Sequence, residues 1–400
     1  MKQTASAWII LVATLMIQAL VAMALITLPV VAPVVSDAIG VSTTYVGFYV
    51  AIVYVAAMIS TIMGGSFVKR WGALRLSQVS LLFTATGLVL CALPWPATIV
   101  IGALMIGLGY GPVTPASSHL LIKTTPPERM SLVFSIKQTG VPVGGMLAGL
   151  LVPSMEILMG WQAAFVMVAL FCVLCALAVS PLRLQLDEDR NPAIRPSLIK
   201  SFVEPIKLVL GQASLRILAA VSFLFAITQL SLTTYLVTFL YEDLGWGLVA
   251  AGLALTVSQA AGVGGRILWG WMADNWLGSG FMLIGIAGLL FGGAALVPWL
   301  TIDTPTLWLY LLLMLLGATA IGWNGVYLAE VARQAPSGLA GMATGGTLGF
   351  TFLGVLCGPP LFGVAASRLG SYGDAYALLM IPAFVIAVLL WVSRKRWVAN

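Results

Sequence analysis

The chain has 400 residues, of which 60% are hydrophobic and only 8% are charged, and its formal net charge is +6. A soluble domain carries about a quarter charged residues. A water-soluble core could not bury this much apolar sequence, so the solvent around most of the chain must be lipid. The positive charge is therefore expected at the edges of membrane segments and does not indicate a nucleic-acid partner.

Residue types that build enzymatic or metal centres are scarce. The single histidine, His119, excludes a site with several histidine ligands. Cys172 and Cys175 have CxxC spacing, but they lie in an apolar run without the polar surroundings that a thiolate site needs. We interpret them as packing residues, and we predict no metal, no cofactor and no enzymatic activity.

Apolar runs of membrane-spanning length follow one another along the whole chain. The first run comes after Met1-Lys2-Gln3 and is too long for a signal-peptide core, so we expect a retained helix. A membrane-spanning helix needs about 20 mostly apolar residues. Cuts at charges, prolines and turn residues predict an all-α protein with twelve spans, near residues 8–35, 44–68, 74–94, 97–122, 130–153, 161–181, 214–240, 247–273, 280–300, 305–332, 339–366 and 374–393.

A long polar interval divides the predicted spans six and six. It contains the run Asp187-Glu188-Asp189-Arg190 and several prolines, and we expect a short surface helix around 205–210. The sequence therefore predicts an N-terminal six-helix bundle, a cytoplasmic linker and a C-terminal six-helix bundle, over residues 1–182, 183–213 and 214–400.

Basic residues lie almost entirely on one side of the predicted membrane. If the N-terminus is cytoplasmic, sixteen of the nineteen lysines and arginines fall on the cytoplasmic side, and only Arg368 falls opposite, with six acids. Cytoplasmic loops of membrane proteins carry such an excess of positive charge. We predict a multi-pass protein of the inner (plasma) membrane with both termini in the cytoplasm, surrounded by the lipid bilayer and monomeric.

The two halves also repeat weakly. Gly65-Ser-Phe-Val-Lys69-Arg70-Trp-Gly72 follows the second span, and Gly270-Trp-Met-Ala-Asp274 follows the eighth, 205 positions later. A duplicated six-helix unit is the architecture of many secondary transporters.

At these loops the chain resembles the major facilitator superfamily, and the resemblance covers its whole length. The family's loop signature is roughly Gly-x-x-x-Asp-Arg-x-Gly-Arg, and here Lys69 stands where the acid is expected, whereas Asp274 keeps the acid in the second half. The resemblance implies that the loop residues hold the two halves together on the cytoplasmic side in one conformation. These residues are Gly65, Arg70, Gly72, Gly270 and Asp274.

Two further stretches resemble parts of this superfamily. Gly140-x-Pro142-x-Gly144-Gly145 is similar to the end of a glycine–proline signature found in antiporters and also in importers. We expect Pro142, Gly144 and Gly145 to bend and closely pack the fifth helix. The run from Gly265 to Asp274 looks like the eighth helix of the oxalate/formate and monocarboxylate branches, where an arginine in the place of Arg266 is implied in carboxylate binding. Those branches can also have a basic residue in helix eleven, and residues 339–366 contain none.

Two basic residues lie inside predicted spans. Lys137 is roughly 10 Å past the start of its helix, so it either presents its charge to an anionic substrate in a central cavity or reaches the inner surface or an acid between helices. Arg266 has glycines at positions 262, 264 and 265, which permit close approach. It either binds a carboxylate with its planar fork or forms a structural pair, for example with Asp274.

Polar and aromatic side chains in other spans are further candidates for substrate contacts. His119 shares a helix face with Lys123, and it either relays a proton or donates a hydrogen bond within the bundle. Each of the others also has an alternative role in helix–helix contacts. They are Gln18, Tyr45, Tyr49, Gln138, Gln229, Tyr235, Gln259, Trp323, Asn324 and Tyr327.

No acidic residue lies clearly in the middle of a predicted span, and Glu330 is expected to pair with Arg333. Positive intramembrane charges favour an anionic substrate. The sequence therefore predicts a secondary transporter that takes up a small organic anion, a carboxylate, with protons carried by His119 or by the substrate itself. The alternative is an exporter of hydrophobic or drug-like compounds with the same fold. A membrane enzyme or sensor is a third class, for which the sequence offers few suitable groups.

Overall fold

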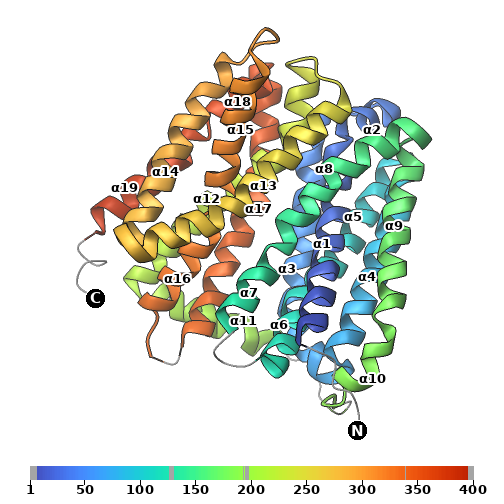
Figure 1. Cartoon of the computed structure of the whole chain (residues 1–400), viewed down its shortest axis with the longest axis vertical. Coiled ribbons are helices and arrows are strands. Elements are labelled where there is room, and N and C mark those ends of the chain that lie inside the picture. Colours follow the sequence, from blue (N-terminus) through green and yellow to red (C-terminus); the bar gives the residue numbers. More distant parts are fainter. Residues whose placement is uncertain (1–6, 126–129, 192, 194–197, 338, 395–400) are drawn as a thin grey trace. The chain divides into compact units, whose positions relative to one another are not determined.

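The computed structural model describes residues 7–125, 130–191, 193, 198–337 and 339–394, which form helices joined by turns (Figure 1). Within these described residues, eleven stretches are long and apolar enough to cross a membrane. One of them, 248–299, contains two helices, α13 (Leu248–Met272) and α14 (Gly278–Leu296). Residues 1–6 and 395–400, which the sequence predicts to be cytoplasmic, lie outside the described residues.

The chain divides into two compact units. Unit 1 consists of residues 1–40 and 52–199, and unit 2 of residues 41–51 and 200–400. The boundary at residue 200 falls inside the polar interval of the sequence. A short piece of the first half, 41–51, has its contacts in unit 2.

Unit 1 is a bundle of long helices, drawn in blue to green in Figure 1. Small residues bring their backbones close together, as is common between membrane helices. A Cβ atom on Gly87 would lie 2.6 Å from the Gly102 carbonyl oxygen, and one on Gly144 would lie 2.3 Å from that of Ala19. The helices are α1 (Ala7–Val30), α2 (Ala32–Ile39), α3 (Val46–Trp71), α4 (Ala73–Cys91), α5 (Pro96–Tyr110), α6 (Val113–Thr124), α7 (Met130–Gln138), α8 (Gly140–Met159) and α9 (Trp161–Ala178).

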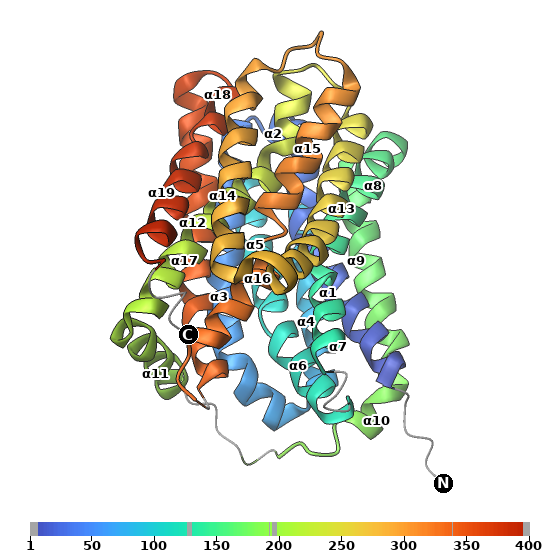
Figure 2. The ribbon, with the colours of Figure 1, turned by 60° about the vertical axis from the view of Figure 1, so that its left-hand side comes forward.

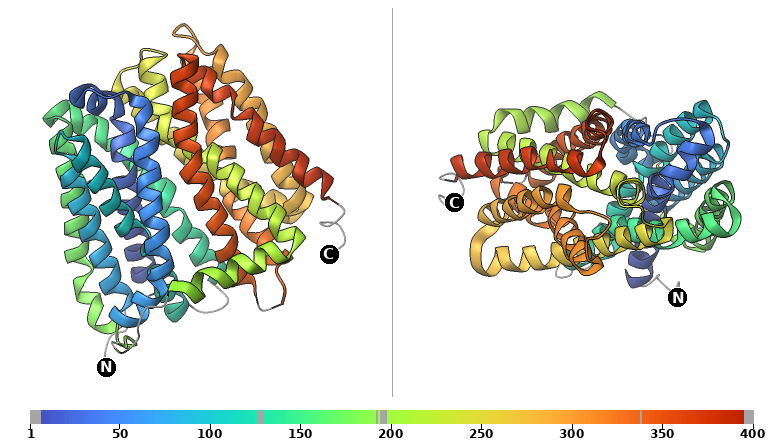
Figure 3. Two further views of the ribbon diagram at one scale, coloured as in Figure 1. Left: turned by 180° about the vertical axis from the view of Figure 1, so that it is seen from behind. Right: turned by 90° about the horizontal axis from the view of Figure 1, so that it is seen from above.

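Unit 2 is built in the same way around its longest helices. A Cβ on Gly354 would lie 2.1 Å from the Phe223 carbonyl oxygen, so glycine permits the contact between α17 and α12. The short helix expected in the polar interval is present as α11, which runs across the long helices (Figure 3). The helices are α11 (Leu198–Gly211), α12 (Ala213–Glu242), α13, α14, α15 (Thr306–Ala320), α16 (Asn324–Gln334), α17 (Ala340–Leu369), α18 (Tyr372–Ala377) and α19 (Met380–Val392).

Several predicted spans are interrupted. The span predicted at 97–122 consists of two helices, of which α5 ends at Tyr110 and α6 begins at Val113. The helix breaks here because Pro112 cannot donate the backbone hydrogen bond that a continuous helix needs. The span predicted at 305–332 breaks at residues 321–323, between α15 and α16. Each break frees backbone groups inside the bundle, where they can bind side chains.

The four cysteines have free thiols, and three of them are buried. Cys172 and Cys175 both lie in the interior of unit 1 on α9, which agrees with a packing role.

The polar interval begins by closing one end of unit 1. After α10 (Arg183–Leu186), the carboxylate of Asp187 accepts hydrogen bonds from the backbone amides of Leu74 and Arg75, each at 2.8 Å. It thereby caps the start of α4. Gly72 has φ +94°, and a Cβ there would lie 2.2 Å from the Asp187 Cγ, so glycine is required both by the turn and by this contact.

We expect Asp187→Ala to lower the free energy of unfolding by about 1–2 kcal/mol, because the amides of Leu74 and Arg75 at the helix start lose their acceptor. Thermal unfolding of the purified protein in detergent checks this. Asp189→Ala is the matched control, since Asp189 is a more exposed carboxylate two residues away. Equal losses in both variants would contradict the capping role.

Candidate functional site

Lys137 is a buried charge at the end of α7, with 1% of its surface exposed. Among the described residues, only two other charged residues are buried, Asp187 and Glu330. Both are satisfied: Asp187 caps α4, and Glu330 accepts hydrogen bonds from Arg333 and Gln334, which confirms the predicted Glu330–Arg333 pair. In contrast, no carboxylate of the described chain forms an ion pair with Lys137.

The glycines that follow Lys137 explain how its helix reaches the interior. A Cβ on Gly140 would lie 2.9 Å from the Cβ and Cγ atoms of Gln18 on α1, so this face of α8 packs directly on α1. Lys137 is three residues earlier, on α7, which also packs on α1. The Gln18 Oε1 accepts from Thr114 at 3.3 Å, while its buried Nε2 has no hydrogen-bond partner in the described part of the chain. Unit 1 therefore holds a lysine and an unsatisfied amide donor on adjoining helices.

In unit 2 the polar candidates gather at the break between α15 and α16. The Gln229 Oε1 on α12 accepts hydrogen bonds from the Trp323 Nε1 at 3.0 Å and from the Asn324 Nδ2 at 3.2 Å. Phe225 stacks on Trp323 with ring centroids 4.9 Å apart, and Tyr327 packs edge-on against Trp323 at 5.1 Å. These contacts fix Gln229, Asn324 and Tyr327 as one cluster.

The Tyr327 hydroxyl is a second unsatisfied group. It is buried close to Ser222 and Thr347, but it makes no hydrogen bond of good geometry with the residues that the structure describes. A buried hydroxyl without a well-formed hydrogen bond costs free energy, and a substrate-binding role of Tyr327 stays a prediction.

Arg266 lies at the same break. Its Nε donates to the Ile321 carbonyl at 3.3 Å, which the end of α15 leaves without a helical partner. Gly265 makes this possible, because a Cβ there would lie 2.6 Å from the Ala318 carbonyl oxygen. Gln259 is buried seven residues earlier on α13, two turns along the same face. The structure therefore brings Arg266 to the helix break that also carries Asn324.

His119 has a partner outside the bundle. Its Nε2 lies 2.7 Å from the Asp189 Oδ2, and the Lys123 Nζ lies 3.2 Å from the Asp189 Oδ1. Partial burial works to raise the pKa of the Asp189 carboxyl, but the hydrogen bonds from His119 and Lys123 outweigh it and hold the pKa below its usual value. The carboxylate is therefore charged at cellular pH, and His119 is tied to the polar interval; its role toward substrate or proton stays a prediction.

The remaining residues predicted from the sequence lie at several different places in the structure. Gln138 ends α7 and is half-buried, and Tyr49 is buried on the part of α3 that belongs to unit 2. Pro142, Gly144 and Gly145 are buried in α8. A Cβ on Gly65 or Gly270 would meet nothing within 4 Å, and Asp274 is exposed in a π-helical turn. Their conformational role stays a prediction, with Gly72 alone among the loop glycines required by contact and φ.

Tyr235, one of the candidates from the sequence, belongs to a polar cluster whose other members the sequence does not indicate. In unit 2, the Tyr235 hydroxyl donates to the Thr44 carbonyl at 2.7 Å and accepts from the Gly47 amide at 2.8 Å. The Tyr372 hydroxyl lies 2.7 Å from the Thr43 Oγ1, which also donates to Glu242. The partners are about 190 to 330 positions apart, so no local pattern could have predicted the cluster.

Helical bundles with intramembrane charges define a polytopic membrane protein with a polar path or site inside it. The sequence matches the Major Facilitator Superfamily over residues 14–347, and the chain belongs to this family of transporters. The predicted resemblance is thereby confirmed.

Relatives with named substrates include two bacterial acid transporters. The chain is 29% identical over 350 residues to the gentisate transporter of Corynebacterium glutamicum, covering 80% of this chain and 73% of that one. It is 21% identical over 378 residues to the hexuronate transporter of Bacillus subtilis, covering 88% and 86%. A match to an uncharacterized transporter of Mycobacterium tuberculosis, 26% identical over 272 residues and 68% of this chain, spans only 59% of that relative's length.

Solved structures share the fold at low sequence identity. The nucleoside transporter NupG gives a TM-score of 0.80 at 14% identity, covering 96% of this chain and 99% of that one. The D-xylose–proton symporter gives 0.73 at 18% identity, covering 96% of both chains. The fold is therefore that of a major facilitator transporter.

Proposed function

We propose that this protein is a secondary transporter that takes up a small organic anion, a carboxylate, together with protons by alternating access. It has twelve transmembrane helices, counting α13 and α14 separately, and both termini face the cytoplasm of an inner membrane. The location of the basic residues supports this orientation.

Burial of Lys137 without an acidic partner is the observation that carries the proposal. A charge in low dielectric is costly unless an opposite charge or a water-filled path compensates it. Since no described carboxylate does so, an anionic substrate is the partner that satisfies the lysine. The unsatisfied Gln18 amide supplies a hydrogen-bond donor to the same anion.

In unit 2, the proposed substrate residues are Arg266 and the polar cluster at the α15–α16 break. Asn324 and Gln229 are joined there by a hydrogen bond, and the ring of Tyr327 packs against Trp323, which also donates to Gln229. Tyr49, Gln138 and Gln259 complete the proposed set. Relatives named for gentisate, hexuronate and benzoate support a carboxylate substrate, since all three are organic acids.

Proton coupling in this proposal needs no intramembrane carboxylate. The two buried carboxylates of the described chain, Asp187 and Glu330, already have structural partners. The proton therefore travels on the substrate or on His119.

The test is uptake into proteoliposomes of a radiolabelled panel containing gentisate, benzoate, a hexuronate, a neutral sugar and an amine. We expect saturable uptake of at least one acid, accelerated by an inwardly directed proton gradient, and none of the amine. Efflux of lipophilic dyes without any acid uptake would contradict the proposal and favour the exporter.

A further inference from the structure

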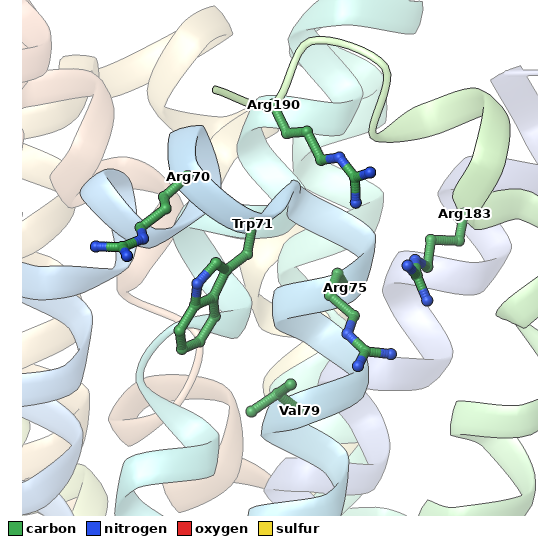
Figure 4. Close-up of a pocket in the computed structure, with 6 residues that line it drawn as sticks. All are labelled: Arg70, Trp71, Arg75, Val79, Arg183 and Arg190. Carbon is green, nitrogen blue, oxygen red and sulfur yellow. The ribbon is translucent and has the colours of Figure 1, made fainter. Parts of the chain in front are cut away.

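A cluster of four arginines lines a cavity of about 620 Å³ at the end of unit 1 that carries α10 (Figure 4). We propose that this cavity binds the phosphate headgroup of an anionic phospholipid, at a site separate from the substrate residues. Its walls come from the end of α3, the start of α4 and the polar interval. The lining residues are Arg70, Trp71, Arg75, Val79, Arg183 and Arg190.

The polar interval is fixed against the α3–α4 turn, which keeps the arginines together. Asp187 caps α4, and the Asn191 amide donates to the Lys69 carbonyl at 2.7 Å. Arg183 lies four residues before Asp187, and Arg190 lies between the two anchors, so both are held at the cavity that Arg75 also lines. In Figure 4 the guanidinium groups of Arg75, Arg183 and Arg190 point toward one side of the cavity.

Two acids of the interval, Asp187 and Asp189, are bound outside this cluster. Asp187 is bound to backbone amides, and Asp189 is paired with His119 and Lys123 on α6, which lies at the same end of unit 1 (Figure 2). Across the described ranges, no ion pair joins a lining arginine to a carboxylate. Positive charges around one cavity repel one another. An anion relieves this repulsion, and the planar arginine fork suits phosphate oxygens.

The surroundings indicate a lipid rather than a soluble phosphate. Trp71 is 39% exposed at the end of a membrane helix, where tryptophan commonly marks the membrane interface. An apolar groove of about 380 Å³ between α1 and α9 ends at Leu182, directly before Arg183. Exposed Trp8, Val12 and Met16 line this groove. Arg183 therefore lies where acyl chains give way to headgroups.

Basic pockets between membrane helices on the cytoplasmic side are typical sites for anionic headgroups. The distribution of basic residues predicts that this end of unit 1 is cytoplasmic. An anionic lipid of the inner leaflet, such as phosphatidylglycerol, can thus reach the cavity from the bilayer.

The experiment titrates the delipidated full-length protein with phosphatidylglycerol or phosphatidylcholine and counts bound lipids by native mass spectrometry. Arg75→Gln/Arg183→Gln is compared with Lys207→Gln/Arg216→Gln, a matched loss of two exposed charges from unit 2. We expect preferential binding of phosphatidylglycerol, weakened about tenfold or more in the first variant and unchanged in the second.

Three outcomes would overturn the proposal. They are no preference for phosphatidylglycerol in the parent protein, equal weakening in both variants, and displacement of the bound lipid by millimolar inorganic phosphate, which would assign the cavity to a soluble anion. The parent's lipid preference needs no mutation, so a variant that fails to fold leaves the test intact. Arg75→Lys/Arg183→Lys keeps the charges and should retain part of the binding.

Discussion

Replacing Lys137 with methionine is expected to abolish acid uptake and at the same time to make the protein more stable. Methionine fills a similar volume, but it removes a buried charge that no described carboxylate pairs. We expect the free energy of unfolding to rise by about 1 kcal/mol or more, since an unpaired buried charge costs far more than a thioether. Uptake in proteoliposomes and thermal unfolding of the same preparation measure the two effects.

A gain in stability together with a loss of uptake distinguishes a substrate-binding role of Lys137 from a structural one. If Lys137 instead held helices together, its replacement would lower both the stability of the protein and its transport activity. Lys207→Met, which changes an exposed residue of α11, is the control and should change neither quantity. A destabilised Lys137→Met protein would therefore refute the assignment of Lys137 to substrate binding.

Arg266 is expected to tolerate neither alanine nor lysine. Its Nε–H donates to the Ile321 carbonyl, which orients the guanidinium at the α15–α16 break. Lysine keeps the charge but lacks the planar fork. We expect Arg266→Ala and Arg266→Lys both to lower uptake of the acid by about 10- to 100-fold, the loss of one charge-assisted hydrogen bond to the substrate.

The measurement is the concentration dependence of uptake, which separates weaker binding from slower turnover. Arg216→Lys, at the exposed start of α12, is the matched control. If Arg266→Lys kept the wild-type apparent affinity, a point charge would be sufficient. Carboxylate binding by the planar arginine fork would then be contradicted.

The spans and the polar interval could be predicted because they depend on composition alone. Long apolar runs require lipid, and the run from Asp187 to Arg190 cannot enter it. The Glu330–Arg333 pair was predictable because its members are three positions apart on one helix.

The site could be predicted only as a set of unconnected candidates. Gln229 meets Trp323 from 94 positions away, across a contact set by helix packing, and nothing in either local sequence signals it. The break at residues 321–323 lies in a continuous apolar run without proline, so the hydrophobic pattern does not mark it. The carboxylate that caps α4 is likewise 113 positions from the amide it binds.

Gly72 and Asp187 have a consequence for how this chain can evolve. A side chain at position 72 would occupy the space of the Asp187 carboxylate, so a substitution there also displaces the cap of α4. Two positions 115 residues apart thus form one mutational unit, and the cost of changing both should be well below the sum of the separate costs. Sequence drift in the α3–α4 turn is therefore constrained by a residue in the polar interval, and neither position can vary freely while the other is retained.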